Sequence, residues 1–492
     1  MLSAFDANWS LMTPEIVLAV LAMIIFTIDF MTGIHGKKPF LGRLSIIALL
    51  VTAVLVIFVN PQGGTIGHIF ILDPFSMIFK VILLVAVAIV IAISMYYVEK
   101  NEDIYQGEYY SIMLFATLGA MLMVSSADLI TLFIGLEIVS ISSYVLAGFK
   151  KHRKKSTEAA IKYVILGGAA SAFILYGMSF LYGLTGTTSL YEIGAAIPGV
   201  YEQYPFMIML SLLFMVVGFG FKISVAPFHM WAPDVYEGSP TSVTSFLTVV
   251  SKLAAFALVM RVLFIGFGGI IEEWAFIIAV IAALTMILGN LIALAQKNVK
   301  RLMAYSGIAQ AGYLLVPIAA AFNINVSAST IAFYGVAYVL MVLGAFAVIT
   351  FVTEESGNED IASFSGLYKR SPYLALAMGV FLVSLAGLPA TAGFIGKFYI
   401  FVGAVSGDML WLAIIMIAMS IVSFYYYFGI IRQMFMREPK TSLDGQPAGT
   451  LKAPAGISTV VGVSLAGTII LGFFPGILIN FFNSFNWMFM FF

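Results

Sequence analysis

The stretch VVGFGFKISVAPF (residues 216–228) places a lysine, Lys222, inside a long apolar run. Two further stretches have the same character: FLTVVSKLAAFAL (246–258) around Lys252 and PATAGFIGKFYIF (389–401) around Lys397. A fourth, TLFIGLEIVSISSY (131–144), carries a single acid, Glu137. A charge at the centre of a bilayer costs about 2.5–3.5 kcal/mol on insertion scales, so such residues usually line an ion path, a substrate path or an internal ion pair. We therefore expect a chain that moves charge across a membrane.

The composition supports a membrane protein and excludes several other classes. Of the 492 residues, 62% are hydrophobic and 10% are charged, with a net charge of zero. A zero net charge offers no electrostatic case for binding nucleic acid. Cysteine is absent, which excludes disulfides, cysteine-ligated iron–sulfur clusters and thiol catalysis in this chain. The four histidines are too scattered to suggest a metal or haem site, and no phosphate-binding loop or dinucleotide motif occurs. ATP hydrolysis and direct NADH binding are therefore not expected.

Apolar windows of about 20 residues predict an all-α polytopic fold with about fourteen transmembrane helices. The N-terminus has no basic region of the signal-peptide kind, so we expect the first window to remain as a spanning helix. The windows lie at 13–33, 41–60, 75–98, 109–126, 128–149, 157–184, 205–228, 240–266, 273–295, 301–321, 327–352, 372–402, 409–434 and 456–481.

Lysine and arginine in the loops predict the orientation of the chain. The loops after odd-numbered helices are basic, as in KKHRKK (150–155) and QKNVKR (296–301), whereas those after even-numbered helices contain neither residue. Because cytoplasmic loops carry the excess of basic residues, both termini are predicted on the outer side. The loop after helix 7, HMWAPDVYEGSP (229–240), is an acidic exception, which suggests packing against protein instead of anionic lipid.

Two helices are predicted to be broken. Pro227 follows Lys222 in helix 7, and Pro389 lies among glycines in helix 12. Proline removes a backbone hydrogen bond and clashes with the preceding turn. Because the broken helices are five apart in order, helices 4–8 and 9–13 are candidate inverted repeats, an arrangement typical of transporters. The predicted units are helices 1–3 (1–108), the first repeat (109–266), the inverted second repeat (267–434) and a cytoplasmic loop with helix 14 (435–492).

The four intramembrane charges are candidate proton-translocating residues. We expect Glu137 to pair with Lys222, because a nearby carboxylate stabilises a buried ammonium. Lys252 lies near the centre of helix 8, where snorkelling is hard, and is expected to relay protons. Lys397 follows the break of helix 12 and is expected to act as a relay or exit. The alternative for Glu137 is a structural ion pair that only packs helices, and for Lys222 and Lys397 it is snorkelling to the interface.

Other polar residues near helix ends suggest structural roles. Snorkelling is expected for the cations of helices 3 and 8 that lie near helix ends, Lys80 and Arg261, whereas the role of Lys162 stays open. Anchoring or capping is expected for Asp29 and Asp128. The cluster after helix 7 indicates either a gate or a cap; it comprises His229, Trp231 and Asp234.

Three sequence motifs resemble those of a known protein family. The segments GFKISVAPFHMWAPDVYEGSPTSV (220–243), KRLMAYSGIAQAGYLL (300–315) and SLAGLPATAGFIGKF (384–398) resemble the antiporter-like membrane subunits of respiratory complex I. Within that family the chain is most similar to subunit N of the bacterial proton-translocating NADH–quinone oxidoreductase. The details are DVYEGSPT, a lysine at position 252, and an end soon after helix 14. The resemblance covers nearly the whole chain.

The resemblance implies the inverted five-helix repeats and a polar axis through Glu137, Lys222, Lys252 and Lys397. It also implies that flavin, iron–sulfur clusters, NADH and quinone bind other subunits, and that this chain has no cofactor of its own. Gln310 is a departure, because subunit N proteins often have histidine there. Glutamine cannot titrate, so a proton would have to pass it on water.

The resulting expectation is a proton-translocating subunit of an NADH–quinone oxidoreductase, a translocase embedded in the plasma membrane. Its expected partners are other antiporter-like and small transmembrane subunits, together with lipid, and not nucleic acid. Two alternatives stay open at this stage. One is a subunit of a multi-subunit sodium/proton antiporter, and the other is a non-pumping scaffold that keeps its charges as structural pairs.

Overall fold

A computed structural model describes residues 8–33, 38–59, 62–101, 104, 106–320, 323–439 and 449–487. The positions outside these ranges include His35, Lys37 and Lys440, which belong to the basic loops after helices 1 and 13. Residues 440–448 of the predicted cytoplasmic loop before helix 14 lie outside the described residues as well.

The described chain contains thirteen helices that are long and apolar enough to cross a membrane. Twelve of them are α1 (Thr13–Met31), α2 (Pro39–Phe58), α3 (Pro74–Lys100), α4 (Gln106–Ser125), α5 (Leu129–Ala147), α6 (Lys154–Thr185), α8 (Pro205–Ile223), α12 (Ile271–Ala293), α13 (Val299–Ala320), α14 (Ile324–Ser356), α18 (Leu410–Met436) and α19 (Ala455–Phe473). The thirteenth changes its winding along its length: α10 (Thr241–Phe246), the π-helical η2 (Leu247–Ser251), α11 (Lys252–Arg261) and the π-helical η3 (Val262–Gly266). The shorter apolar helices α16 (Pro372–Ala386) and α17 (Ala392–Ser406) complete the predicted fourteen as one broken span.

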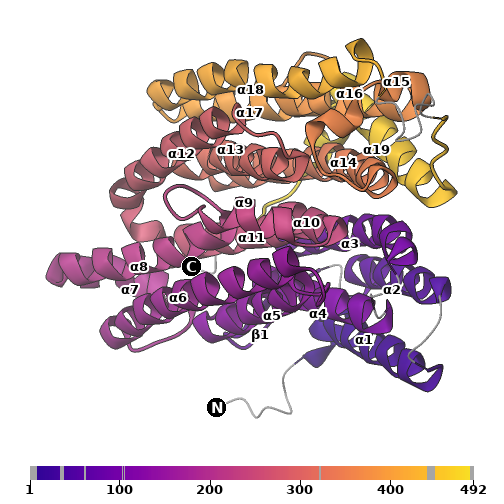
Figure 1. The fold of residues 1–492 in the computed structure, drawn as a ribbon. Helices are drawn as coiled ribbons and strands as arrows, with labels where there is room; N and C mark the ends of the chain where they lie inside the picture. The colour runs from indigo at the N-terminus through magenta and orange to yellow at the C-terminus, as the bar shows by residue number, and fades with distance from the viewer. Residues whose placement is uncertain are drawn as a thin grey trace.

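Shorter elements lie between the spans. They are α7 (Leu190–Gln203), α9 (Trp231–Gly238), α15 (Leu367–Arg370), α20 (Gly476–Asn483), the 3₁₀ turns η1 (Trp9–Met12), η4 (Gly268–Ile270) and η5 (Ile361–Phe364), and an antiparallel hairpin of β1 (Gly64–Ile66) and β2 (Phe70–Leu72). The spans lie side by side in a stack, with α1, α4 and α5 toward one side, α10 and α11 in the middle, and α12–α14 followed by α16–α18 toward the other side (Figure 1).

Both predicted helix breaks are confirmed. In the first, α8 ends at Ile223 and α9 begins at Trp231, so Pro227 lies in the break. In the second, α16 ends at Ala386 and α17 begins at Ala392, with Gly387 at φ +92° between them. The breaks leave carbonyl groups without partners in their own helix, and in a membrane such groups must be satisfied by protein or water.

Three sequence predictions of local structure are wrong. The segment 185–204 is not simply a loop, because Leu190–Gln203 forms the helix α7, whose apolar side packs against the protein. The acidic loop after helix 7 contains α9, the second half of the broken helix, which tolerates Pro233 near its start. The predicted last helix, 456–481, is interrupted at Phe474 before Pro475, and α20 follows.

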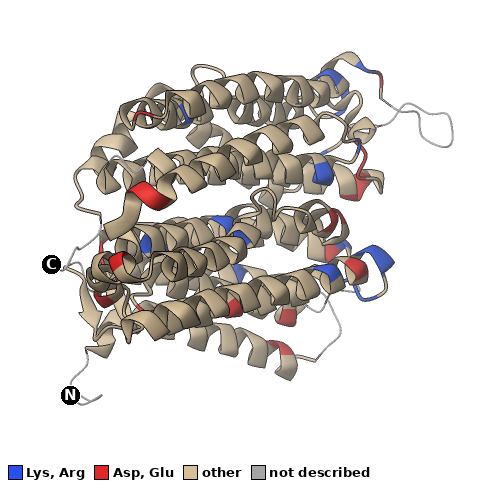
Figure 2. Ribbon diagram, turned by 90° about the vertical axis from the view of Figure 1, so that its left-hand side faces the viewer, with Lys and Arg blue, Asp and Glu red and all other residues tan. Residues whose placement is uncertain are grey.

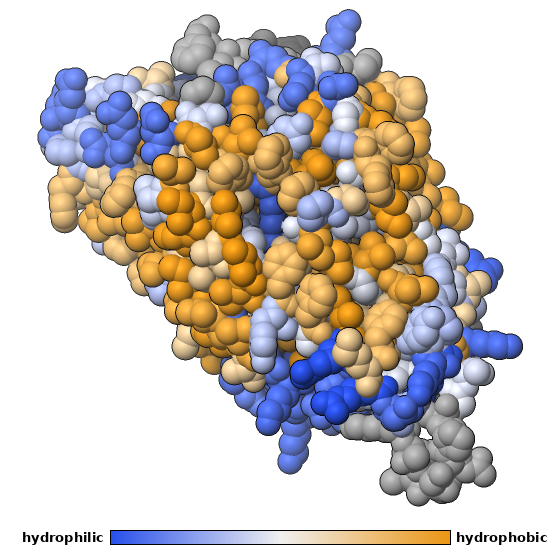
Figure 3. Space-filling model, turned by 90° about the horizontal axis from the view of Figure 1, so that it is seen from above, coloured by the Kyte–Doolittle hydropathy of each residue, from blue (hydrophilic) through white to orange (hydrophobic). Residues whose placement is uncertain are grey.

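Charged residues gather mainly at the two ends of the helices, and a few basic positions lie along the middle of the bundle (Figure 2). One face shows an apolar band between two hydrophilic ends (Figure 3). The exposed apolar side chains of α18 include Ile414, Ile421 and Tyr425. An apolar belt of this kind suits a surface that contacts lipid or other membrane subunits.

Candidate functional site

Glu137 and Lys222 lie close to one another, but the predicted direct ion pair is not what the structure shows. Lys222, in the last turn of α8, donates from Nζ to Ser140 Oγ, whereas Glu137 accepts from Ser171 Oγ of α6. Ser140 follows Glu137 by three residues on α5, so both side chains lie on one face of that helix. The serine hydroxyl therefore stands where the carboxylate was expected.

Lys252 is the first residue of α11 and follows the π-helical turn η2 directly. Its side chain is buried, and Nζ donates to the backbone oxygen of Gly307 on α13 at 2.6 Å. A Cβ at position 307 would lie only 3.3 Å from this Nζ, so the glycine allows the ammonium to reach the backbone. The central lysine thus binds a neutral oxygen of the neighbouring helix.

Lys397 on α17 occupies the break of helix 12. Its Nζ donates to the carbonyl oxygens of Leu385 at 2.9 Å and Ala386 at 3.2 Å, and to Ser420 Oγ of α18 at 3.3 Å. These two carbonyls belong to the last turn of α16, where an α-helix has unsatisfied oxygens and the negative end of its dipole. The helix break therefore creates the site that holds the lysine.

Helix α13 connects the central lysine with the lysine at the break. Gly307, which accepts from Lys252, is followed three residues later by Gln310 on the same helix. Gln310 donates from Nε2 to the Leu385 oxygen at 3.3 Å, and this oxygen also accepts from Lys397. Tyr334 of α14 donates to Gln310 Oε1. The residue that departs from the resembled family is therefore a hydrogen-bonding link in this row.

Buried hydroxyl groups extend this row toward α18. Ser306 and Tyr427 share a hydrogen bond of 2.6 Å, and Ser420 Oγ lies 3.4 Å from the Tyr313 hydroxyl. The ammonium of Lys397 also lies 4.5 Å from the centre of the Tyr313 ring. Single serines and tyrosines in apolar helices carry little sequence signal, so sequence reasoning missed these groups.

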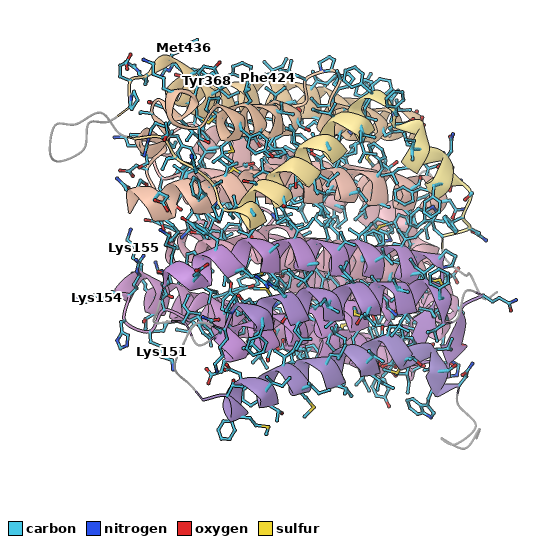
Figure 4. The ribbon with its side chains drawn as sticks, turned by 90° about the vertical axis from the view of Figure 1, so that its right-hand side faces the viewer. Lys151, Lys154, Lys155, Tyr368, Phe424 and Met436 are labelled. Carbon is cyan, nitrogen blue, oxygen red and sulfur yellow. The ribbon has the colours of Figure 1, made fainter. Side chains whose placement is uncertain are left out.

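The end of the bundle that carries Lys151, Lys154 and Lys155 is called the basic end (Figure 4). The other basic loops meet there as well, since Lys150 donates to Asn101 Oδ1 at 2.5 Å and Lys300 pairs with Glu359 at 3.0 Å.

The acidic helix α9 also lies at the basic end and is fixed there by ion pairs. Asp234 binds Lys162 at 2.7 Å and Arg301 at 2.7 Å, and Glu237 binds Lys155 at 2.8 Å and Arg301 at 3.0 Å. Burial opposes the charged form of both acids, but the hydrogen bonds from these cations hold the pKa of Asp234 and the pKa of Glu237 below their usual values. The prediction that this segment packs against protein is confirmed, and Lys162, left open by the sequence, is one of its partners.

The predicted cluster after helix 7 has separate contacts for each member. Trp231 donates from Nε1 to the Phe221 oxygen at 2.9 Å and stacks on Tyr163. Asp234 belongs to the ion pairs just described. His229 is buried, and burial lowers the pKa of its imidazole. These contacts favour a cap that closes the break of helix 7.

Two fully buried ion pairs contradict the prediction that Lys80 and Arg261 snorkel to the interface. Lys80 on α3 lies 2.6 Å from Glu15 on α1, and Arg261 on α11 lies 2.6 Å from Asp73 before α3. The side chains of Lys80, Arg261 and Asp73 are completely inaccessible. The sequence showed their distance from helix ends, but not that neighbouring helices enclose these positions and supply carboxylates.

The two aspartates behave as the sequence predicted. Asp128 caps α5 by accepting from the backbone N–H of Ile130 and Thr131. Asp29 anchors Lys38 in an ion pair of 2.6 Å. Within the described part of the chain, no three His, Asp or Glu side chains are grouped in a way that could hold a metal ion.

Comparison with known proteins identifies the family. The family model described as "NADH:quinone oxidoreductase/Mrp antiporter, TM" matches residues 126–423. The chain is 44% identical to the NADH-quinone oxidoreductase subunit N of Brevibacillus brevis, over 97% of this chain and 95% of that one. It is 41% identical to the protein of the same name from Bacillus anthracis, with the same coverage.

Solved structures agree with this assignment. A chain of respiratory complex I from Thermus thermophilus with bound aureothin matches with a TM-score of 0.80 and 31% identity, over 95% of this chain and 99% of that one. A chain of the Mrp complex from Dietzia has a TM-score of 0.79 at 19% identity, over 98% and 96% of the two chains, which shows the shared fold alone. With this fold, these buried lysines and these relatives, the chain belongs to the NADH:quinone oxidoreductase/Mrp antiporter family of membrane subunits, among the proteins called subunit N of NADH-quinone oxidoreductase.

Proposed function

We propose that this chain is a proton-translocating membrane subunit of an NADH–quinone oxidoreductase. Electron transfer from NADH to quinone, on flavin and iron–sulfur centres held by other subunits, drives protons through this one. Glu137, Lys222, Lys252 and Lys397 are the proton-carrying groups, and the chain itself contributes no redox centre. It lies in the plasma membrane with both termini outside, in contact with other antiporter-like and small transmembrane subunits.

The observation that carries the proposal is the kind of oxygen that each buried cation binds. Lys222, Lys252 and Lys397 bind hydroxyl or carbonyl oxygens, whereas Lys80 and Arg261 bind carboxylates. An ammonium held by neutral oxygens can release its proton without leaving an opposite charge unpaired in a medium of low dielectric. An ion-paired cation cannot do so, because its carboxylate would then be buried alone. The first three lysines are therefore suited to exchange protons.

The hydrogen bonds made by residues of α13 support a direction for the proton path. Lys252 and Lys397 are joined through Gly307, Gln310 and the Leu385 oxygen, so the central lysine is linked to the break of helix 12. Protons enter near Glu137 and Lys222 from the basic end, pass Lys252, and leave past Lys397. Gln310 does not titrate, so it holds the proton-carrying water in place and passes no proton of its own.

The first test uses inverted membrane vesicles that carry the whole complex with Lys252→Ala. NADH-driven quinone reduction and proton uptake are measured together, and assembly is checked on a native gel. We expect proton uptake to fall about a hundredfold or more, since a positioned proton-transfer group contributes roughly 10²–10⁴-fold. Lys38→Ala is the matched control, because Lys38 is also a buried lysine but is paired with Asp29.

The other outcomes are equally informative. Unchanged pumping in an assembled Lys252→Ala complex would contradict the proposal and favour a scaffold whose charges are structural. If NADH oxidation stays normal while the cells lose their tolerance of sodium, the chain serves a sodium/proton antiporter instead.

A further inference from the structure

The helical segment that carries Lys252 is bounded by unusual backbone on both sides. α11 runs from Lys252 to Arg261, the π-helical η2 ends immediately before it, and the π-helical η3 begins immediately after it. π-helical turns are rare and frequently occur at functional sites. Here two π-helical turns flank a helical segment of ten residues, which has a cation at each end, Lys252 and Arg261. This combination distinguishes the segment from the other described helices.

A π-helical turn does not by itself fix the register of the helical segment that follows it. Its hydrogen bonds run from i to i+5, so a return to α-helical winding moves the next segment by one residue. In an α-helix one residue corresponds to about 1.5 Å of rise and about 100° of rotation. Contacts outside the helix must therefore decide where α11 stops and where the Lys252 ammonium points.

Arg261 supplies such contacts at the far end of α11. Its Nε donates to the Val124 oxygen of α4 at 2.6 Å, and its Nη2 donates to Asp73 Oδ1 at 2.6 Å. The guanidinium also lies 4.9 Å from the centre of the Phe75 ring. Asp73 is itself fixed, since it caps α3 and accepts from the backbone N–H of Ser76. The outer end of α11 is thus bound to α3 and α4.

We propose that Arg261 and Asp73 are positioning residues for Lys252. The two charges hold the register of α11 between its π-helical turns, so that the Lys252 ammonium, nine residues before Arg261, stays on the Gly307 oxygen. This inference rests on the proposed function, because it assigns a role toward a proton-carrying lysine. The neighbouring pair Glu15–Lys80 joins α1 to α3 and has no member on α11.

The test compares three single variants in the whole complex, with protons taken up per NADH oxidised as the readout. Arg261→Gln and Asp73→Asn each remove one charge, and asparagine is as good a helix cap as aspartate, so α3 keeps its cap. Arg261→Lys keeps the charge. Because a displacement of about 1 Å at a reacting group can cost about a hundredfold, we expect the ratio to fall about tenfold or more in the first two. Arg261→Lys is expected to retain most of the wild-type ratio.

Two controls separate positioning from plain loss of stability. Asp29→Asn removes the carboxylate of another, partly buried ion pair, Lys38–Asp29. Asp29 lies on α1, away from α11, so this change should leave the ratio unchanged. The double variant Arg261→Gln with Asp73→Asn leaves no unpaired charge, so it is designed to assemble even where a single variant does not. A normal ratio in this assembled double variant would overturn the inference.

The failure of this inference can be told apart from failure of the proposed function. If Lys252→Ala abolishes coupled proton uptake while the double variant pumps normally, only the positioning role is wrong. If Lys252→Ala itself leaves proton uptake unchanged, the proposed function is wrong, and a fall in the double variant would then report a different defect.

Discussion

At the scale of single residues, the chemistry of the candidate path depends on what each buried side chain binds. The sequence placed Lys252 and Lys397 inside apolar runs, and the structure adds that both reach backbone oxygens. Gln310 lies between them and hydrogen-bonds to the Tyr334 hydroxyl and the Leu385 oxygen. A buried polar group that loses its hydrogen-bond partner costs about 1–3 kcal/mol, so the loss of any of these hydrogen bonds should have a measurable effect on stability.

Gln310→Leu is the first residue-scale prediction. The substitution leaves the Tyr334 hydroxyl without its acceptor and interrupts the row between Lys252 and Lys397. We expect protons taken up per NADH oxidised to fall about tenfold, which corresponds to about 1.4 kcal/mol, while the complex still assembles. Gln310→His can both donate and accept, so it is expected to retain pumping. Equal pumping in the leucine and wild-type complexes would show that the row does not carry protons.

The second residue-scale prediction concerns Lys150 in the basic end. Burial lowers the pKa of this lysine from 10.5 to about 8. Between about pH 8 and pH 10.5 the unfolded chain therefore binds more protons than the folded one, and the free energy of unfolding rises with pH. Below pH 8 the lysine is charged in both states, and this contribution no longer changes.

Thermal unfolding of the purified complex tests whether stability rises with pH in this range. The wild type should gain stability relative to Lys150→Met between pH 8 and pH 9.5, and the difference between them should be constant from pH 6.5 to pH 7.5. Lys154→Met, a change of an exposed lysine at the start of α6, is the control for loss of a positive charge. A difference that falls with rising pH would contradict the expected direction.

At the scale of secondary-structure elements, the broken helices are what turn apolar spans into binding sites for lysine. Gly387 ends α16 with φ +92°, a conformation that costs other residues about 1–2 kcal/mol. A Cβ at this position would also lie 3.1 Å from Lys397 Cδ. The glycine therefore serves both the turn and the close approach of the lysine.

Gly387→Ala tests this at the break of helix 12. We expect a loss of about 1–2 kcal/mol in stability from the strained backbone, and reduced proton uptake because the Lys397 side chain is displaced. Gly403→Ala is the matched control on α17, since a Cβ there meets nothing within 4 Å. Alanine favours a helix over glycine by up to about 1 kcal/mol, so the control should be neutral or slightly more stable. The same loss in both variants would refute a specific role of the break.

At the scale of the whole molecule, the basic end predicts how the chain lies in the membrane. Lys151, in the loop before α6, and Lys154 and Lys155, at the start of α6, lie at one end of the helices together with the other basic loops (Figure 4). By the positive-inside rule this end faces the cytoplasm. Helix α7 follows α6 at the opposite end and is predicted to face outward.

Cysteine labelling tests this orientation directly, because the natural chain has no cysteine to interfere. Lys154→Cys lies in the basic end, and Glu192→Cys lies on α7; both positions are exposed. A membrane-impermeant maleimide should label Glu192→Cys in intact cells and Lys154→Cys only in inverted vesicles. The opposite pattern would place both termini inside and reverse the predicted direction of the path.

The spans, the two breaks and the positions of the intramembrane charges could all be predicted from the amino-acid sequence. These follow from local rules: an apolar run long enough to cross a bilayer, a proline that interrupts it, and the cost of a charge within it. The approximate extent of most helices needs no knowledge of neighbouring segments. The amphipathic helix α7 was missed because it is short and lies along the protein without spanning the membrane.

The partners of these charges, in contrast, depend on how distant helices pack together. Lys80 and Arg261 lie as near to helix ends as a snorkelling residue would, yet packing of α1, α3, α4 and α11 encloses them and supplies Glu15 and Asp73. Lys222 meets Ser140 in place of Glu137 for the same kind of reason. The side of a helix that a residue occupies follows from its own sequence, but the group opposite it depends on which distant helix packs there. That choice separates lysines bound to neutral oxygens, which can exchange a proton, from cations locked in ion pairs.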